Sequence, residues 1–196
     1  MLEREVDGKL QIIAAIRLFR FSRLIQLNAG SSLFSAVSYD SFESGCKKID
    51  PVCGRLICWI SFSAGAEFLA KGVCLLRDVE LRTSKQRSTD FGTLGDLIGK
   101  NGKKGKLGHL ADAVQANDKQ RQMIVGAYKE LAAIRNRDAH TYAPNIQANH
   151  FGIVGATLVP CFNLLTSWLP YSSEDICLWS DNAPQFIAGL SNFETP

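Results

Sequence analysis

Apolar residues recur along most of the chain at the three- and four-residue spacing of amphipathic helices, and no stretch reads convincingly as a strand. The first such segment covers residues 8–38, which we expect to form one or two helices. Three arginines step by three along it and form a basic stripe, which we interpret as a solvated helix face. They are Arg17, Arg20 and Arg23.

A second, longer helix is predicted over residues 52–82. Asp50 and Pro51 make a typical helix start, because aspartate caps free amide groups and proline fits the first helical position. Glu67 and Lys71 stand four residues apart inside this otherwise apolar segment. Such a pair faces either solvent or a site, and we expect the solvent-facing arrangement.

Residues 83–106 break the helical pattern, although Leu94 and Leu97 predict one short helical turn within them. Residues 99–106 are rich in glycine and lysine and are typical of a flexible basic loop. This loop is either solvated or in contact with an RNA backbone. The lysines that would then bind RNA are Lys103, Lys104 and Lys106.

Two more helices are predicted in the second half of the chain. Asn117 can cap a helix over residues 118–140, and Pro144 disfavours its continuation. A last helix follows over residues 146–169, where Pro160 would introduce a kink.

Four long helical segments without strands predict an all-α fold, an up-and-down bundle of four to five helices. We expect the bundle to occupy residues 1–170, with its core in 50–170. Residues 171–196 would form an irregular C-terminal tail that packs on the bundle or on a partner. The 196 residues are 46% hydrophobic and 21% charged, which is the composition of a globular domain.

Residues 141–173 contain no charged side chain, and their apolar part, residues 151–169, is just long enough to cross a bilayer. Polar residues, glycines and Pro160 interrupt this apolar part, and no positive flank follows it. We therefore interpret it as a buried bundle helix and expect no membrane partner. The mixed charge of the first residues indicates no secretory signal.

The six cysteines show no CxxC spacing and the chain has three histidines, so we predict no structural zinc site and no cofactor. Cys58 and Cys74 lie in apolar helical runs, which favours buried free thiols in a reducing cytoplasm. A disulfide framework is the alternative. The net charge of +3 is too small to indicate nucleic-acid binding by itself.

Polar groups that can carry chemistry gather where the helix over residues 118–140 ends. Residues 135–140 read Arg-Asn-Arg-Asp-Ala-His. Histidine can act as a general acid or base near neutral pH, and arginine donors suit phosphate oxygens. A histidine beside arginines, without metal ligands, favours metal-independent phosphodiester cleavage in which the 2′-hydroxyl of RNA attacks.

The spacing of these residues constrains the site. Asn136 and His140 share a helix face, whereas Arg135 and His140 lie about 140° apart on a continuous helix. The latter two converge only if the helix ends between them or if a second copy of the chain contributes. We therefore expect a homodimer with a composite site.

Arg135, Asn136 and His140 at the end of a bundle helix resemble the R-x4-6-H motif of HEPN domains, in which Asn, Asp or His commonly follows the arginine. The resemblance covers residues 50–170, with the strict pattern in 135–142. It implies a dimeric bundle of four or five helices with two motifs in one cleft. It also implies a metal-independent endoribonuclease that leaves 2′,3′-cyclic phosphate and 5′-hydroxyl ends, in toxin–antitoxin or antiviral systems.

Within that resemblance, His140 would be the acid or base, Arg135 would bind the scissile phosphate and Asn136 would orient the site. Arg137 falls at a variable position of the motif, and its charge makes it a candidate RNA contact. Tyr142 completes the form R-x4-H-x-Y, found in HEPN toxins that pair with a nucleotidyltransferase antitoxin. There the tyrosine can be adenylylated, which silences the nuclease; a tyrosine that packs beside the motif is the alternative.

Two other interpretations of the whole chain remain open at the level of sequence. One is a non-catalytic HEPN module that binds RNA or a partner protein, because a bundle can keep its fold without the chemistry. The other is a structural bundle in which Arg135 and His140 merely satisfy a helix end. His109 and His150 are expected to be surface or packed histidines.

Overall fold

The structure of the chain is a computed structural model, and it describes residues 2–28, 51–81, 93–99, 102–140, 149–172 and 174–176. Side chains are described for the same residues apart from positions 2, 23–28, 51–59, 136–140 and 149–156. Several predictions fall outside the described residues. They concern residues 29–38, Cys46, Asp50, residues 83–92, Tyr142, Pro144 and residues 177–196.

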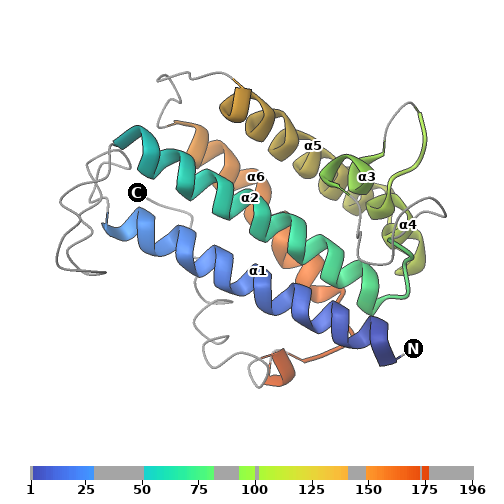
Figure 1. The fold of residues 1–196 in the computed structure, drawn as a ribbon. Helices are drawn as coiled ribbons and strands as arrows, with labels where there is room; N and C mark the ends of the chain where they lie inside the picture. The colour runs from blue at the N-terminus through green and yellow to red at the C-terminus, as the bar shows by residue number, and fades with distance from the viewer. Residues whose placement is uncertain are drawn as a thin grey trace.

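The described residues fold into helices and contain no strand, which confirms the all-α prediction. The helices are α1 (Leu2–Asn28), α2 (Pro51–Leu76), α3 (Leu94–Ile98), α4 (Lys106–Ala113), α5 (Asp118–His140) and α6 (Asn149–Ser167). The four long helices alternate in direction: α1 and α5 run one way, and α2 and α6 run the other (Figure 1). This is the expected up-and-down bundle, with the short helices α3 and α4 beside the start of α5.

Helices α1 and α2 pack closely along their lengths, because small residues let the two backbones approach. A Cβ atom on Gly72 would lie 2.6 Å from Cδ1 of Ile12, and one on Gly8 would lie 2.7 Å from Cγ of Leu76. We call these contacts the glycine seam. The seam fixes α1 and α2 as one antiparallel pair, against which the rest of the bundle packs.

Aromatic side chains join the helices at the centre of the core. The rings of Phe19, Phe62 and Phe162 lie with centroids 5.2 to 5.7 Å apart, which unites α1, α2 and α6. Tyr128 of α5 adds an edge contact to Phe162 at 6.5 Å. Burial of Leu158, Phe162 and Leu165 confirms α6 as a core helix of the bundle. In the described ranges, we find no helix with the length and apolar character that crossing a bilayer requires.

The end of α2 differs from the prediction. The helix was expected to reach residue 82 but ends at Leu76. Asp78 adopts φ 57°, the N–H of Val79 donates to the carbonyl of Cys74 at 2.8 Å, and that of Asp78 donates to Leu75 at 3.2 Å. This is a Schellman motif, which glycine usually closes. No glycine marks the position, so the sequence carried no stop signal.

The start of α5 agrees with the prediction. The side-chain oxygen of Asn117 accepts from the N–H of Gln120 at 2.9 Å, and the Gln120 side chain accepts from the N–H of Asn117 at 3.1 Å. This reciprocal pair is a capping box and fixes the first turn of the helix. The predicted short turn is α3, where Asp96 caps in the same way on Thr93.

Of the loop predicted over residues 99–106, the structure describes Gly99 and residues 102–106, and only Lys106 among them is helical. The backbones of Gly99 and Gly105 touch, so that a Cβ on Gly105 would lie 2.2 Å from the carbonyl carbon of Ile98. Helix α4 begins immediately afterwards at Lys106, and its buried residues face the core. Gly99 and Gly105 therefore lie close together, because glycine permits this backbone contact.

The chain returns to α1 after α6 ends. The hydroxyl of Tyr171 donates to Glu5 at 2.7 Å, and the ammonium of Lys9 lies 4.9 Å from the same ring. Ile176 is buried, and the Arg77 side chain donates to the carbonyl of Trp168. These contacts hold residues 168–172 and 174–176 against the bundle.

Candidate functional site

The candidate site lies in the last two turns of α5. The backbone is helical over Asp118–His140, so the helix offers no break between Arg135 and His140. These two residues therefore leave the helix axis in directions about 140° apart, and Asn136 shares a face with His140. Of these three side chains, only that of Arg135 is among the described ones. Arg137 likewise has its backbone in α5, and its side chain is outside the description.

Arg135 is held by a carboxylate from another helix. Its Nη1 donates to Oε2 of Glu67 in α2 at 2.9 Å, and its side chain remains 44% exposed. Helical side chains lean toward the N-terminus of their helix, so Arg135 reaches back along α5 to meet Glu67. The guanidinium is thus fixed at one edge and open to solvent elsewhere.

Glu67 also accepts from a second cation. Its Oε1 lies 2.7 Å from Nζ of Lys71, one turn further along α2. The side chain of Lys71 is 10% exposed and that of Glu67 is 16% exposed, and the Lys71 ammonium lies 5.9 Å from the Phe68 ring. We call Lys71, Glu67 and Arg135 the charge triad. The expected solvent-facing pair is wrong: both residues are largely buried, and Glu67 faces the arginine of the motif.

Burial explains why the three groups stay together. An ammonium taken out of water is stable only beside an opposite charge, and Glu67 supplies that charge to Lys71. The shared carboxylate carries one negative charge against two positive ones, so the charge triad keeps a net charge of +1. The site is therefore cationic at the exposed guanidinium, although Arg135 is paired.

Tyr128 anchors α5 to α2 one residue away from Glu67. Its hydroxyl is fully buried and donates to the carbonyl of Ala66 at 2.6 Å. Burial raises the pKa of Tyr128 well above its ordinary value, with smaller contributions from Cys161, Cys74 and Glu67. The phenol therefore stays neutral, and its role is to hold the two helices in register beside the charge triad.

The predicted RNA-binding lysines lie elsewhere. Lys104 pairs with Asp112, which also accepts from Arg121 at 2.6 Å. Hydrogen bonds from Lys104 and Arg121 hold the pKa of Asp112 below its ordinary value. Lys103 is exposed and Lys106 is half-buried. The charge of Lys104 is thus already partly engaged within the chain.

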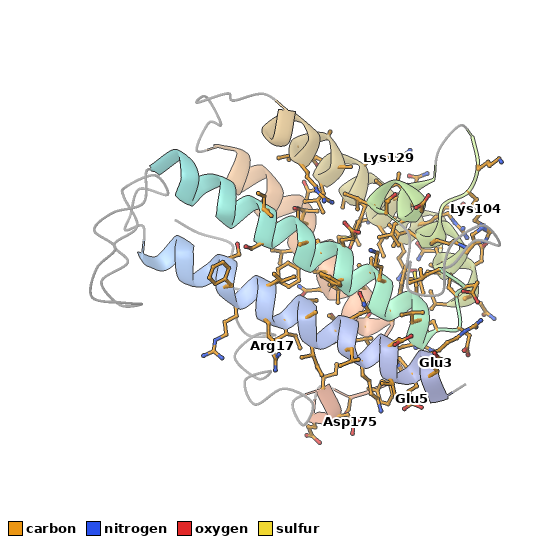
Figure 2. All side chains as sticks on the ribbon, in the orientation of Figure 1. Glu3, Glu5, Arg17, Lys104, Lys129 and Asp175 are labelled. Atoms are coloured by element: carbon orange, nitrogen blue, oxygen red, sulfur yellow. The ribbon has the colours of Figure 1, made fainter. Side chains whose placement is uncertain are left out.

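Distance also separates these lysines from the motif. They lie beside α4 and the start of α5, where Figure 2 labels Lys104. At about 1.5 Å per residue, the backbones of Arg121 and Arg135 are roughly 21 Å apart along the helix. Within one chain, the structure does not bring Lys103, Lys104 and Lys106 to Arg135.

The other chemistry-bearing residues take structural positions. Cys74 is a free, buried thiol, as predicted, and so is Cys161, whereas the side chain of Cys58 is outside the description. Burial raises the pKa of Cys74 and of Cys161 to about 12. A protonated thiol is a poor nucleophile and metal ligand. Within the described part of the chain, no three His, Cys, Asp or Glu residues gather as a metal site would require. His109 is exposed on α4, and the side chain of His150 is not described.

The basic stripe of α1 is a solvated face where it is described. Arg17 and Arg20 are exposed, and Figure 2 shows Arg17 pointing away from the bundle. Exposed Val6 and Leu10 continue the same face toward the start of the helix. This face lies on the outer side of α1.

The sequence indicated each residue of the charge triad, but it did not indicate that Arg135 contacts Glu67. Glu67 and Lys71 were visible as charges in an apolar segment, and Arg135 as part of the motif. The hydrogen bond between Glu67 and Arg135 joins residues 68 apart in the chain, and no local pattern signals such a contact.

Comparison of the chain with protein-family models, with curated proteins and with solved structures gives no match. The resemblance to HEPN domains therefore rests on residues 135–142 and on their place at the end of a bundle helix.

Proposed function

We propose that this chain is a metal-independent endoribonuclease of the HEPN type that uses Arg135 and His140. The observation that carries the proposal is the state of Arg135: it is fixed by Glu67 at 2.9 Å, remains 44% exposed, and stands one turn before the end of α5. An oriented, exposed guanidinium suits the oxygens of a phosphodiester. His140, the last residue of the same helix, supplies a group for proton transfer.

The proposed reaction uses a nucleophile that RNA itself provides. A base removes the proton of the 2′-hydroxyl, whose oxygen attacks the adjacent phosphorus. The bond from phosphorus to the 5′-oxygen breaks, and an acid protonates the leaving oxygen. The products are a 2′,3′-cyclic phosphate and a 5′-hydroxyl. Arg135 stabilises the negative charge that builds on the phosphoryl oxygens, and His140 transfers a proton.

A homodimer supplies what one chain lacks. Arg135 and His140 diverge by about 140° on an unbroken helix, and each chain offers one motif histidine. In a dimer with two motifs facing one cleft, Arg135 of one copy meets His140 of the other. Each such pair is one site, in which the single His140 takes the proton of the 2′-hydroxyl and then protonates the leaving oxygen. Asn136, on the face of His140, orients the same group.

Cleavage of RNA by the purified protein, beside four variants, tests the catalytic claim. Arg135→Ala and His140→Ala should each lower the cleavage rate by roughly 100-fold or more. Arg17→Ala and His109→Ala are matched controls, because both residues are exposed and lie outside the motif. The ends of the products are identified by their chemistry, and cleavage should persist in EDTA. Equal rates in all five proteins would refute the proposal; RNA binding without cleavage would indicate the non-catalytic module.

Co-expression of two inactive variants tests the dimer. In a heterodimer of Arg135→Ala and His140→Ala chains, one composite site loses both residues and the other keeps both. An equal mixture should therefore recover about a quarter of the wild-type activity, because half the dimers are mixed and each has one intact site. If each chain used its own Arg135 and His140, the mixture would stay inactive.

The remaining expectations from the sequence, on RNA-binding residues and on Tyr142, depend on this function. Lys103, Lys104, Lys106 and Arg137 would bind RNA, the lysines at a distance from the site. In a toxin–antitoxin or antiviral setting, a nucleotidyltransferase antitoxin would adenylylate Tyr142. Incubation with such an enzyme and ATP should silence the wild-type protein and leave Tyr142→Phe active; silencing of both would remove Tyr142 from the proposal.

A further inference from the structure

We infer that Glu67 is a positioning residue for Arg135. We also infer that Lys71 keeps the site positively charged, because it balances the negative charge of Glu67. This inference rests on the proposed function, because it assigns a role in the same reaction. It concerns two residues of α2 that lie outside the motif. It follows from the geometry and charge of the charge triad.

The geometry gives Glu67 control over the direction of Arg135. A free arginine side chain samples many rotamers, and a hydrogen bond to a fixed carboxylate selects among them. The carboxylate is fixed because it is 16% exposed and bonds to both cations, at 2.7 and 2.9 Å. Its helix is tied to α1 by the glycine seam and to α5 by Tyr128. A guanidinium has five donors, so the bond from Nη1 to Glu67 leaves donors for a phosphate.

The charge balance explains the presence of Lys71. A carboxylate alone beside Arg135 would cancel its charge and weaken its attraction for phosphate. Lys71, 2.7 Å from the same carboxylate, restores a net charge of +1 to the group. The lysine does not need to touch RNA to do this. Its side chain, 10% exposed, compensates Glu67 from inside the bundle.

A purely stabilising role is a weaker explanation of the charge triad. Largely buried ion pairs repay the loss of hydration poorly, and apolar residues of similar size often replace them without loss of stability. The neighbours of these two residues on α2 include Ala66, Ala70 and Cys74, which are buried in the core. We therefore assign Glu67 and Lys71 a role in function, which they exert on the exposed guanidinium of Arg135.

The test compares kcat and KM for RNA cleavage in Glu67→Gln with those in Glu130→Gln. Glu130 lies on α5, five residues before Arg135, so its variant loses the same charge without touching the charge triad. Glu67→Gln should lower kcat roughly 10-fold, and Glu67→Asp should recover part of the loss. Glu130→Gln should match the wild type. Lys71→Met should raise KM several-fold with little change in kcat, because attraction falls while orientation remains.

Measurements in the Arg135→Lys variant show whether Glu67 acts through the guanidinium of Arg135. If Glu67 acts through the guanidinium, Glu67→Gln should cost little when Arg135 is already lysine. If Glu67→Gln does not fold because Lys71 is left unpaired, Glu67→Gln with Lys71→Met takes its place and should show the same loss of kcat.

The outcomes separate this inference from the proposed function. Glu67→Gln with the kcat of Glu130→Gln, in a protein that needs Arg135, would refute the positioning role alone. If Glu67→Gln lowered kcat as much in the Arg135→Lys background as in the wild type, the positioning role would be refuted as well, because Glu67 would then not act through the guanidinium. A wild-type protein that does not cleave RNA would overturn the proposed function and the inference together.

Discussion

Alkaline pH should destabilise this protein through its two buried thiols. Cys74 and Cys161 are inaccessible to solvent, and burial raises the pKa of each to about 12 from the ordinary value of 9.0. The folded chain therefore keeps both protons at a pH where the unfolded chain has lost them. Since the unfolded state binds fewer protons, the free energy of unfolding falls as pH rises from 9 toward 12.

The size of the effect follows from these values. At pH 10, one pH unit above the ordinary thiol pKa, ionisation stabilises the unfolded state by about 1 to 2 kcal/mol per thiol. The two thiols together lower the free energy of unfolding by about 3 kcal/mol. Tyr128, whose pKa burial also raises, adds to the loss above pH 10. A loss of this size is a large part of the stability of a typical domain.

Urea denaturation under reducing conditions, at pH 7.5 and at pH 10, measures the effect. Exposed groups titrate alike in all variants, so the comparison with Cys74→Ala isolates one thiol. That variant should be less stable at pH 7.5, because it leaves a small cavity, but its loss of stability between the two pH values should be smaller by about 1 to 2 kcal/mol. Cys161→Ala should behave in the same way. An identical pH dependence in the wild type and both variants would refute the burial argument.

Four further predictions concern stability and use the same denaturation measurement. Tyr128→Phe removes the buried hydrogen bond to the carbonyl of Ala66 and should cost about 1 kcal/mol, since that carbonyl keeps its partner within the helix; no change would mean that the bond does not form. Gly105→Ala should cost about 3 kcal/mol or more, because its Cβ would meet backbone atoms at 2.2 and 2.3 Å that no side-chain rotation can move. Gly126→Ala is the opposite case: nothing lies within 4 Å, and helix propensity should stabilise the protein by about 1 kcal/mol, so equal effects at both glycines would contradict the packing described. Asn117→Ala breaks the capping box of α5 and should cost about 1 kcal/mol, which an unchanged midpoint would exclude.

The helices that the sequence predicted best are those with explicit end signals. Asn117 begins α5 where its capping side chain indicated, and Pro51 begins α2. Helix ends closed by unusual residues were missed. Asp78 and Gln115 adopt φ 57° and φ 55° after α2 and α4, positions where a glycine would have been the signal.

Helix α4 was missed for a different reason. Its buried residues Leu107, Leu110 and Ala111 do follow helical spacing. The preceding glycines and lysines, together with Gly108, are typical of loops, and this composition outweighed a short periodic run. Composition did not reveal that the backbones of Gly99 and Gly105 touch.

The candidate site was predictable as a motif but not as a structure. Residues 135–140 could be recognised because they are contiguous and carry arginine beside histidine. The partner of Arg135 could not be recognised, because Glu67 meets it through the packing of α2 on α5. That packing depends on side-chain volumes in the core, which helical periodicity does not encode.

The glycine seam constrains how this sequence can change over evolutionary time. Gly72 faces Ile12 and Gly8 faces Leu76, so the room on one helix is set by the size of a residue on the other. A homologue with alanine at position 72 should carry a smaller residue than isoleucine at position 12, and the same exchange should link positions 8 and 76. Covariation at these two pairs would reveal the antiparallel register of α1 and α2 from sequences alone.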